Sequence, residues 1–561
     1  MTLYFYPPDL RQQFVDRERE LQQLAHYLDQ LRAGRPTHVA LFGLRRIGKT
    51  LLLKELMARL LAEGEDVVPI YVDLSESCAS PEHFATAYIG LTAYWFLTRG
   101  QALPLPYFDP YTLYAQVASA REPILEEAVR QLNQELDKAK PNRHLLLELA
   151  FGLPAHLAQE RGMRFVVILD EFQEIRTLEN FTDTRNVVAI FRANLQHQSR
   201  VAYFLAGSAI TALSGMIADY RSPLFVQLVQ IPLGGFDRDS TAALVAHWLP
   251  EAAQNSFLTE EIYALTQGHP FYITALCQRM GAYHETADRP LTPQLARESF
   301  VVETLSHTGA IYELCRYVHD VALHRATGYA SLKAVLYILA TEEGLTASAV
   351  SRRLKVTPGT ARNYLRWLVE VDLVIEKDKH YYFRDPVLRY WVAMVTRGIE
   401  VTPAAPPVDL MTLIEELDLL YQRAATELGL AKESQVRELL RAFAGQTVDG
   451  ALFGLSGKIT LPTFNQVEPY VAPADVYELD ALAEGDERWA VEVKWRNRRA
   501  DYNDLTRFYA KALDLDARSW FIAKTGLTPS AQTYAREKDI LVSTERELQA
   551  LAQRLGVRFA K

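Results

Sequence analysis

A short glycine-rich stretch near the start of the chain has residue types and a spacing that suit phosphate binding. It reads Gly43-Leu-Arg-Arg-Ile-Gly48-Lys49-Thr50. The glycines let backbone N–H groups turn inward onto phosphate oxygens, and the start of a helix adds a favourable dipole. Lys49 suits the β- and γ-phosphates, and the Thr50 hydroxyl suits Mg²⁺. The pattern is that of a Walker A loop, so it predicts a site for ATP.

The segments on either side of the loop are those that must position it. Residues 38–42 form a short apolar run typical of a strand, and residues 51–61 place Leu and Met at helical spacing. This strand–loop–helix context separates a phosphate loop from a chance glycine turn. We therefore expect the whole loop to contact the nucleotide, through Gly43, Leu44, Arg45, Arg46, Ile47, Gly48, Lys49, Thr50 and Leu51.

A second candidate for nucleotide chemistry is the apolar run at residues 164–172, which contains Asp170 and Glu171 at its end. Such a run predicts a buried parallel strand whose C-terminal end meets a ligand. Together with the upstream loop it reads as Walker B. Asp170 is expected to hold Mg²⁺ through water, and Glu171 to orient and polarise the attacking water.

Further apolar runs at residues 67–74, 200–207 and 228–233 complete a predicted parallel sheet. Pro69 cannot donate to a central ladder, so the first of these is expected near the sheet edge. The region up to residue 160 is predicted to be a largely helical insertion. Arg192 and Arg221 are candidates for an arginine finger, supplied in cis or by a neighbouring subunit.

The pattern Phe-x-x-Arg-Glu-x-Glu-Leu from Phe14, followed by the Walker A loop, resembles the archaeal-type ATPases of the AAA+/STAND group. The resemblance implies that Phe14 and Val15 lie near the adenine. It also implies that Ser208 occupies the sensor-1 position, where it can detect the γ-phosphate. A plain strand-terminal turn at Ser208 remains open.

Residues 268–270, Gly-His269-Pro270, end one predicted helix and begin another. They resemble the Gly-x-Pro turn in the helical lid of STAND ATPases, which packs near the nucleotide. The resemblance implies that Pro270 lies near the nucleotide and that His269 is a possible sensor. A core or capping role for His269 remains the alternative.

Three short helices are predicted at 333–341, 347–354 and 358–371, followed by a hairpin at 373–383. That order predicts a winged helix-turn-helix. Residues 331–398 contain 11 Lys and Arg against 7 Asp and Glu, in a chain of net charge −9, which favours DNA contact there. Protein interaction is the alternative. The candidate DNA-contacting residues are Thr357, Thr360, Arg362, Asn363 and Arg366.

The motif Asp-Pro-x-Leu-Arg-x-Trp at residues 385–391, which follows the hairpin, again resembles the archaeal-type ATPases.

The proline-containing segment 401–410 predicts an extended linker to a further domain. Two adjacent strands after it carry Asp480, Glu492 and Lys494. Glu492 and Lys494 are two residues apart and share one face, and a hairpin brings Asp480 beside them. Such a trio would hold one or two Mg²⁺ through Asp480 and Glu492, and Lys494 would stabilise charge during phosphodiester cleavage.

The order of helices and strands around these residues resembles the restriction-endonuclease-like, PD-(D/E)XK fold, as found at the C-terminus of some archaeal-type ATPases. The chain departs from that signature because Leu479 replaces the proline before Asp480. The resemblance implies a metal-dependent nuclease. A degenerate core that binds DNA or a partner is the alternative.

Composition agrees with an ordinary folded protein of several domains, since 49% of the 561 residues are hydrophobic and 23% charged. Cys78, Cys277 and Cys315 have no metal-ligand or disulfide spacing and are expected to be reduced core residues. No leader pattern and no apolar run of about 18 residues is present. We therefore expect a cytoplasmic protein without membrane contact.

The combined expectation is an α/β multidomain chain with five segments. They are a P-loop ASCE/AAA+ ATPase core with a parallel sheet (1–240), a helical lid (241–328), a winged helix-turn-helix (329–400), a linker (401–410) and a restriction-endonuclease-like domain (411–561). The expected function is an ATPase that uses ATP and Mg²⁺, couples to DNA, cuts DNA at the C-terminal site and self-associates into an oligomer. The alternatives are a STAND-type assembly switch and a transcription regulator.

Overall fold

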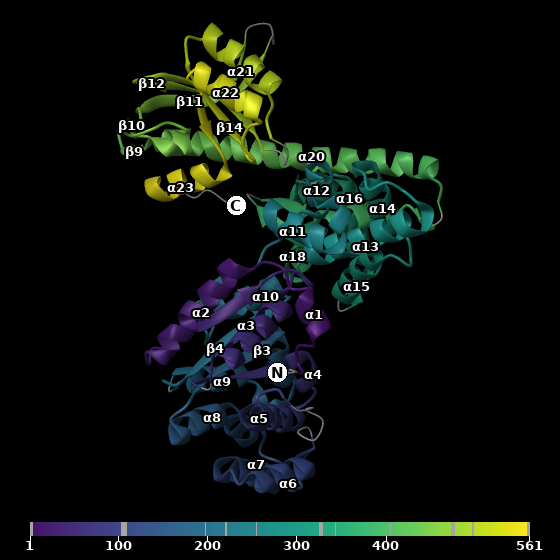
Figure 1. The fold of residues 1–561 in the computed structure, drawn as a ribbon, viewed down its shortest axis with the longest axis vertical. Coiled ribbons are helices and arrows are strands. Elements are labelled where there is room, and N and C mark those ends of the chain that lie inside the picture. The colour runs from purple at the N-terminus through teal and green to yellow at the C-terminus, as the bar shows by residue number, and fades with distance from the viewer. Residues whose placement is uncertain are drawn as a thin grey trace. The chain divides into compact units, whose positions relative to one another are not determined.

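The fold is given by a computed structural model that divides into two compact units (Figure 1). The first unit comprises residues 1–338 and 345–407, and the second residues 339–344 and 408–561. The structure describes residues 4–64, 66–101, 109–196, 198–218, 222–253, 255–324, 329–342, 344–377, 379–403, 405–472, 477–495 and 499–557.

A five-stranded parallel sheet of order β2-β3-β4-β1-β5 lies at the centre of the N-terminal part of the first unit. Its strands are β1 (His38–Phe42), β2 (Val67–Asp73), β3 (Arg164–Asp170), β4 (Val201–Gly207) and β5 (Leu228–Pro232). Most are nearly continuous buried runs, as strands covered on both faces require. The predicted parallel sheet is confirmed, and β2, which contains Pro69, is an edge strand as expected.

Helices cover both faces of this sheet, so that this part of the first unit has three layers (Figure 1). On one face are α2 (Glu18–Arg32) and α3 (Lys49–Glu63), and on the other α5 (Pro81–Thr98), α8 (Arg143–Arg161) and α9 (Val187–Gln196). Helix α2 packs on the sheet because it has one buried apolar stripe, in which leucines recur at helical spacing: Leu21, Leu24, Leu28 and Leu31. Short elements complete this part: α1 (Pro8–Gln12), α4 (Leu74–Ser77), η2 (Phe172–Asn180), η3 (Thr182–Thr184) and α10 (Ile210–Ala218).

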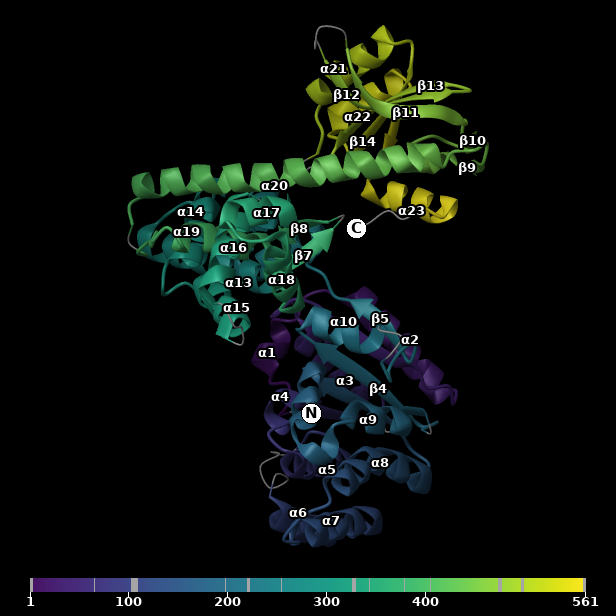
Figure 2. The ribbon, with the colours of Figure 1, turned by 180° about the vertical axis from the view of Figure 1, so that it is seen from behind.

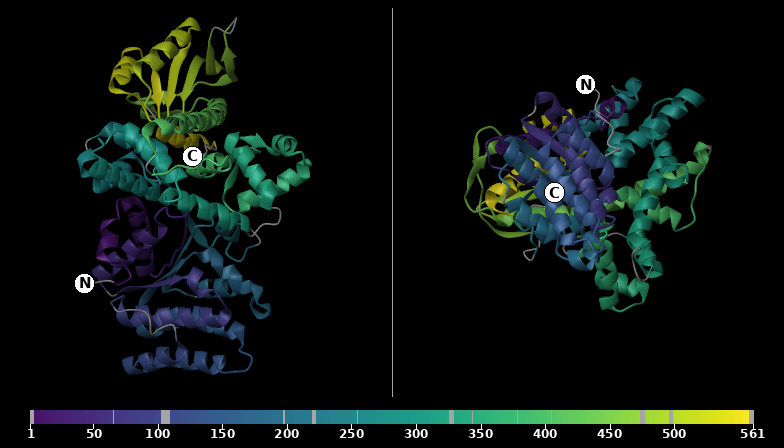
Figure 3. Two further views of the ribbon diagram at one scale, coloured as in Figure 1. Left: turned by 90° about the vertical axis from the view of Figure 1, so that its right-hand side faces the viewer. Right: turned by 90° about the horizontal axis from the view of Figure 1, so that it is seen from below.

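The segment between β2 and β3 is a helical insertion, as expected. Helices α5 and α8 pack together against the strands, and α6 (Pro110–Ala120) and α7 (Pro123–Leu136) lie beyond them as an outer pair (Figure 3). The insertion thus adds helices on one face of the sheet, and its described residues contribute no strand to that sheet.

Five helices follow the sheet and form the region predicted as a lid. They are α11 (Arg238–Trp248), α12 (Ser256–Thr266), α13 (Pro270–Ala287), α14 (Pro293–Leu305) and α15 (Ala310–His324), with the short η4 (Pro250–Ala252). The turn before α13 needs glycine, because Gly268 has φ +73° and a Cβ there would lie 2.0 Å from the carbonyl oxygen of Phe236. Pro270 begins α13, where its missing N–H has no helical acceptor in any case.

The next segment has the helices and hairpin expected of a winged helix-turn-helix (Figure 2). The helices are α16 (Tyr329–Thr341), α17 (Ala347–Leu354) and α18 (Pro358–Glu370), the strands β6 (Leu345–Thr346), β7 (Val374–Lys377) and β8 (His380–Phe383), and α19 (Pro386–Val395) follows. The strands form an antiparallel sheet of order β6-β8-β7. Thr357 caps α18, since its hydroxyl oxygen accepts from the Thr360 N–H. The DNA-binding assignment remains a prediction.

The second unit contains a mixed five-stranded sheet of order β11-β12-β13-β14-β15 (Figure 1). β11 (Phe464–Val471), β12 (Glu478–Gly485) and β13 (Arg488–Lys494) are antiparallel, whereas β14 (Arg518–Ala523) and β15 (Leu541–Ser543) run parallel to β13. The remaining elements are α20 (Pro407–Arg441), β9 (Thr447–Asp449), η5 (Gly450–Phe453), β10 (Lys458–Thr460), α21 (Tyr502–Asp514), α22 (Pro529–Glu537) and α23 (Glu545–Leu555). One face packs on α20 and α23, the other on α21 and α22.

The predicted linker is only partly extended. Residues 407–410 belong to α20, a helix of 35 residues, so the expectation of an extended spacer is wrong for them. Pro407 begins that helix, where proline is tolerated because the first N–H groups lack intrahelical partners. The five predicted segment boundaries otherwise remain predictions.

The three cysteines are buried and unpaired. Burial raises the pKa of the Cys78 and Cys277 thiols to about 12. These thiols are therefore protonated core groups without nucleophilic character. Among the helices that the structure describes, none has the length and apolar character that crossing a membrane would require.

Candidate nucleotide site and a second charged cluster

The Walker A loop joins β1 to α3 in the conformation that phosphate binding needs. Gly48 has φ +103° and precedes the first turn of α3, so the backbone N–H groups of that turn have no helical acceptor. Gly43 is required for a different reason, since a Cβ there would lie 2.7 Å from the Leu233 carbonyl oxygen. The loop therefore presents free donors and a helix N-terminus to an anion.

The Lys49 ammonium group is folded back onto its own loop. Its Nζ donates to the carbonyl oxygens of Gly43, at 2.8 Å, and Leu44, at 2.9 Å. Burial lowers the pKa of Lys49 to about 8, against the opposing effect of Glu171 and Asp170. A phosphate group would place an anion in direct contact with this cation, whose hydrogen-bond partners here are neutral carbonyl groups.

Asp170 and Thr50 lie side by side, as the two predicted metal ligands must. The Thr50 hydroxyl donates to Asp170 Oδ2 at 2.7 Å, and the hydroxyl of Tyr71 on β2 donates to the same oxygen at 2.9 Å. Burial raises the pKa of Asp170, and these hydrogen bonds oppose the shift. Sequence reasoning missed Tyr71, because only the parallel pairing of β2 with β3 brings it to this carboxylate.

Glu171 is held by the residue predicted at the sensor-1 position. Glu171 Oε2 accepts from the Ser208 hydroxyl at 2.7 Å, the Ser208 N–H at 3.2 Å and Gln173 Nε2 at 2.6 Å. Burial by itself raises the pKa of Glu171, but these hydrogen bonds and the charge of Lys49 give a net lowering. Glu171 is thus an ionised acceptor, and its backbone has φ +50°, a conformation that non-glycine residues adopt mainly at special sites.

His269 lies against the phosphate loop from the lid side. Its Nε2 is 3.1 Å from the carbonyl oxygen of Arg45, and its ring stacks on Tyr272 at 4.2 Å. Burial lowers the pKa of His269 to about 4. The imidazole is therefore neutral, with the proton on Nε2, because a carbonyl can only accept. Pro270 directly follows it in α13.

The N-terminal segment is fastened to the loop through Arg17. Its Nη2 donates to the carbonyl oxygens of Ile47, at 3.1 Å, and Gly234, at 2.7 Å, and its guanidinium lies over Phe236. Phe14 and Val15 precede this anchor and are half-buried. Their predicted contact with adenine remains a prediction.

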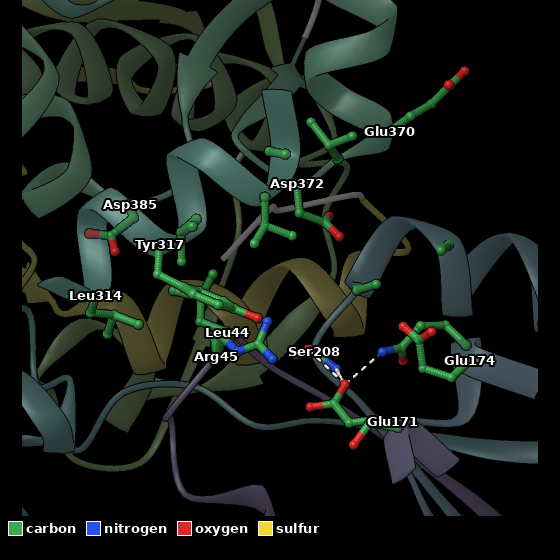
Figure 4. Close-up of a pocket in the computed structure, with 18 of the residues that line it drawn as sticks. Leu44, Arg45, Glu171, Glu174, Ser208, Leu314, Tyr317, Glu370, Asp372 and Asp385 are labelled. Carbon is green, nitrogen blue, oxygen red and sulfur yellow. Dashed lines mark hydrogen bonds between the residues drawn. The ribbon is translucent and has the colours of Figure 1, made fainter. Parts of the chain in front are cut away.

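A cavity of about 640 Å³ adjoins the phosphate loop (Figure 4). It is lined by Leu44 and Arg45 of the loop, Glu171 and Ser208 at the strand ends, and by side chains of α15 and of residues 370–388. Arg192 is exposed on α9 and does not line it. Arg221 lies outside the described residues.

The residues at this site fit the chemistry of Mg-ATP. Lys49 and the N-terminus of α3 suit phosphate oxygens, and the hydroxyl of Thr50 beside Asp170 suits a hard cation that keeps several waters. Within the described chain no cluster of three or more His, Cys, Asp or Glu forms a metal cage. A cation that shares its coordination with substrate phosphates and water is consistent with that absence.

Two carboxylates of the segment that runs from α16 to α19 contact elements elsewhere in the same unit, one on α10 and one on α13. Asp372, just after α18, accepts from the Thr211 hydroxyl at 2.6 Å and pairs with Arg384 at 3.0 Å. Asp385 caps α19 and accepts from the Tyr272 hydroxyl at 2.6 Å. Burial raises the pKa of both carboxyl groups. Sequence patterns gave no signal for these long-range pairs.

The candidate DNA-contacting residues share the solvent-facing side of α18. Thr357, Arg362, Asn363 and Arg366 are exposed, and Thr360 is half-buried. Arg366 Nη2 donates to Asn363 Oδ1 at 2.7 Å. Arg352 and Arg353 on α17 are also exposed, so the positive charge extends over both helices.

The second unit brings Asp480, Glu492 and Lys494 together as predicted. The β12–β13 register pairs Ala481 with Val491, and Asp480 Oδ2 accepts from the Val493 N–H at 2.6 Å. Lys494 Nζ lies 2.5 Å from Glu492 Oε1. Burial, together with the charge of Glu492, raises the pKa of Asp480.

A second lysine completes this cluster. Lys511 on α21 lies 3.2 Å from Glu492 Oε2, so the buried carboxylate has two cationic partners. Helix spacing alone gave no reason to assign Lys511 to the cluster. Two carboxylates with adjacent lysines fit one Mg²⁺ and a phosphate, with water completing the coordination.

Comparisons with known proteins identify the N-terminal region. The AAA ATPase domain family matches residues 13–203, which include the Walker A loop and the Walker B strand. The chain therefore contains an AAA ATPase domain, a nucleotide-binding module. No curated protein matches the sequence.

Several solved structures are similar to the chain. A Walker-type ATPase of Pyrococcus abyssi is 18% identical, with 68% of this chain and 96% of that chain covered and a TM-score of 0.48. The ORC2 protein of Aeropyrum pernix, in ADPNP–ADP complexes, is 18% identical, with 73% and 95% covered and a TM-score of 0.41. The ORC1 protein of Aeropyrum pernix in complex with DNA is 14% identical, with 71% and 98% covered and a TM-score of 0.36.

Proposed function

We propose that the protein is a Mg-ATP-dependent ATPase that couples nucleotide state to DNA. The observation that carries the proposal is the convergence of Lys49, Thr50, Asp170 and Glu171 at one end of the parallel sheet, within an AAA ATPase domain. Each of these four groups matches one requirement of γ-phosphoryl transfer to water.

In this reaction the oxygen of a water molecule bonds to the γ-phosphorus while the bond from that phosphorus to the β–γ bridging oxygen breaks. Glu171 accepts a hydrogen bond from the water and orients it, and the water proton ends on the phosphate product or in solvent. Lys49 balances charge on the β- and γ-phosphates. Mg²⁺, held by Thr50 and Asp170, would neutralise the charge that develops on the phosphate oxygens.

Two substitutions separate binding from hydrolysis. Lys49→Ala should abolish measurable ATP binding, whereas Glu171→Gln should retain it and slow hydrolysis by about 10² to 10⁴-fold, the usual contribution of such a group. Glu179→Gln, on the same η2 segment but outside the cavity, is the control. Hydrolysis in Glu171→Gln at the wild-type rate would refute the assignment.

The DNA part of the proposal is supported by the exposed basic surface of α17 and α18. Arg352, Arg353, Arg362 and Arg366 can neutralise phosphates, and Asn363 has the donor and acceptor that an adenine edge requires. Binding to duplex, branched and single-stranded DNA should therefore weaken as salt rises. Binding that is absent or insensitive to salt would remove this part.

The C-terminal cluster supports a metal-dependent DNA nuclease. Water activated near Asp480 and Glu492 would bond to the scissile phosphorus as the phosphorus–oxygen bond to the leaving nucleotide breaks, with Lys494 stabilising the added charge. The test is cleavage of labelled linear, nicked and branched DNA with Mg²⁺ or Mn²⁺, with and without ATP. Lys494→Ala and Asp480→Asn should abolish cleavage, and exposed Lys458→Ala on β10 should not.

Lys49→Ala in the same assay tests coupling. If Lys49→Ala no longer cleaves DNA, cleavage requires ATP binding. If this variant still cleaves DNA, cleavage is independent of ATP. Absence of cleavage under every condition, with hydrolysis intact, would leave the cluster as a binding surface.

A STAND-type assembly switch is the second candidate, and the contacts of Asp372 with Thr211 and Arg384 favour it. The hydrogen bond from Thr211 holds Asp372 against α10, a helix that begins two residues after Ser208, which contacts Glu171. A switch predicts slow hydrolysis and an ATP-dependent rise in mass, which Asp372→Ala should produce without ATP. A monomer under all conditions would exclude it.

A further inference from the structure

The phosphate loop carries two adjacent arginines whose side chains lie on aromatic rings of the lid. The guanidinium carbon of Arg45 is 4.6 Å from the ring centroid of Tyr317 on α15. That of Arg46 is 4.5 Å from the ring centroid of Phe271 on α13. The loop that would enclose the nucleotide phosphates is thus connected to two separate lid helices.

Arg45 differs from its neighbour because it also lines the cavity that contains Glu171 and Ser208 (Figure 4). Its backbone is held in place, since its carbonyl oxygen accepts from His269. Its side chain is exposed, and within the described part of the chain it pairs with no carboxylate. An exposed cation therefore faces the cavity from a backbone position that a hydrogen bond holds.

A guanidinium over an exposed ring is held weakly, whereas a guanidinium with phosphate forms two parallel charge-assisted hydrogen bonds. Tyr317 is 46% exposed, so water competes with its contact to Arg45. An arginine within the phosphate loop needs only side-chain rotation to leave such a ring for a phosphate. The competition between the two partners therefore favours phosphate once nucleotide is bound.

We propose that Arg45 leaves the Tyr317 ring for the γ-phosphate of bound ATP and supplies in cis the positive charge that stabilises the hydrolytic transition state. The inference rests on the proposed ATP site. Arg45 exchanges no proton: water bonds to the γ-phosphorus, the bond to the bridging oxygen breaks, and the guanidinium balances charge on the equatorial oxygens. This role is distinct from a finger supplied by a neighbouring subunit.

Because Arg45 changes partner only when a γ-phosphate is present, its contact with the lid also depends on which nucleotide is bound. ADP has no γ-phosphate, so with ADP Arg45 stays on Tyr317 and α15 stays fastened to the loop. With ATP the contact is released. Helix α15 packs against α13, α14 and α19. Loss of the contact between Arg45 and Tyr317 therefore also affects α19, the helix that follows the β7–β8 hairpin.

The first experiment measures ATP and ADP dissociation constants and single-turnover hydrolysis for the full-length protein. Arg45→Ala should keep ADP binding within about 3-fold and lower the hydrolysis rate by about 10³-fold, the lower end for an arginine finger. Arg45→Lys should be intermediate, because it keeps the charge without the planar fork. Arg316→Ala, an exposed arginine on α15 that pairs with Glu313, is the matched control.

The second experiment follows hydrogen exchange of α15 without nucleotide, with ADP and with a slowly hydrolysed ATP analogue. Wild type and Tyr317→Phe should lose protection in α15 only with the ATP analogue. Tyr317→Leu, which removes the ring, should show the exposed pattern in all three states. Exchange in α15 that is independent of nucleotide and of the ring would overturn the reporting role.

Hydrolysis by Arg45→Ala at the wild-type rate would overturn the catalytic role, and equal loss of ADP and ATP binding would make Arg45 a structural part of the loop. In both cases the proposed ATPase stands if Lys49→Ala and Glu171→Gln behave as expected. A wild-type protein that binds no nucleotide would instead remove the proposed function and this inference together.

Discussion

At the scale of single residues, the Asp170 carboxylate is the best-defined group of the nucleotide site. Thr50 and Tyr71 both donate to its Oδ2, and the Glu171 N–H donates to its Oδ1 at 3.0 Å. If Thr50 ligates Mg²⁺ as proposed, Tyr71 would be the remaining side-chain donor to this carboxylate. We infer that Tyr71 keeps the carboxylate oriented for the metal.

Tyr71→Phe removes this donor and leaves the ring in place. The Mg²⁺ concentration for half-maximal hydrolysis should rise by about 10-fold, the lower range for loss of a group that orients a metal ligand. Affinity for ATP without Mg²⁺ should not change. A magnesium titration of the hydrolysis rate measures this, and Tyr111→Phe on exposed α6 is the control. An unchanged titration would contradict the role of Tyr71.

Two histidines make stability depend on pH. Loss of hydration lowers the pKa of His38 and of His269 from 6.5 to about 4. Between these values the unfolded chain binds more protons than the folded one, so stability falls as pH falls from 6.5 to 4 and is unaffected by these groups above 6.5. Each histidine contributes a slope of about 1.4 kcal/mol per pH unit in that window.

His38→Asn should remove one of these slopes, because asparagine oxygen can still accept from the Tyr203 N–H as His38 Nδ1 does. Unfolding free energies measured by denaturant at pH 7, 6 and 5 test this. Exposed His144→Gln is the control, and a variant whose pH profile matches wild type would contradict the assignment.

At the scale of elements, α18 faces solvent with the charges that the DNA proposal needs. If Arg362 and Arg366 each contact one phosphate, replacing both by Ala should lower the slope of log affinity against log salt by about 2. The weakening should be similar for all sequences if these contacts are to the backbone. Binding titrations at several salt concentrations measure the slope, with Arg316→Ala as control. An unchanged slope would place the DNA contacts elsewhere.

The junction between α13 and α19 depends on one buried carboxylate. Asp385 caps α19 through the Val387 N–H, at 2.8 Å, and accepts from Tyr272. Asp385→Ala should destabilise the first unit by about 1–2 kcal/mol from the lost cap, and Tyr272→Phe by about 1 kcal/mol. Thermal unfolding of both single variants and the double variant tests the coupling. Strictly additive effects would show that the pair is not coupled.

The elements also show how far the sequence alone reaches. Most strands of the parallel sheet are nearly continuous apolar runs, and glycine and proline mark the phosphate loop and the turn before α13, so local patterns predicted them. The length of α20 was missed because Pro406 and Pro407 read as a linker. β11 was missed because Asn465, Gln466 and Glu468 interrupt its apolar residues.

For the candidate sites too, residues close together in sequence were predicted, and residues brought together by tertiary packing were missed. Residues within one motif, such as Lys49 and Thr50 or Glu492 and Lys494, were predicted because spacing fixes their proximity. Tyr71 and Lys511 were missed because strand pairing and helix packing bring them to the site over long separations in sequence. The stacking of Arg45 on Tyr317 depends on how the lid packs, which no local pattern encodes.

At the scale of the whole molecule, the chain passes from the first unit to the second for the last time near Pro407, and the short segment 339–344 also groups with the second unit. A protease site inserted after Ala405 should allow cleavage into two folded fragments, because domain boundaries tolerate such insertions. ATP affinity should stay within about 3-fold of the intact protein, since every nucleotide-site residue precedes the cut. Any ATP dependence of DNA cleavage should be lost. Loss of ATP binding would show that the first unit is not autonomous, and precipitation of either fragment would show the same for the unit it contains.

The second unit contains its own optical probe. Trp489 and Trp520 are fully buried, their rings lie 5.9 Å apart, and Phe443, Phe453 and Phe464 surround them. Trp489 belongs to β13, the strand that also carries Glu492 and Lys494. Close, rigid indoles give intense near-ultraviolet circular dichroism and a blue-shifted emission. The contribution of this pair, taken as the difference between the spectra of the wild type and of Trp520→Phe, therefore reports whether the strand that holds the charged cluster is intact, without any added label.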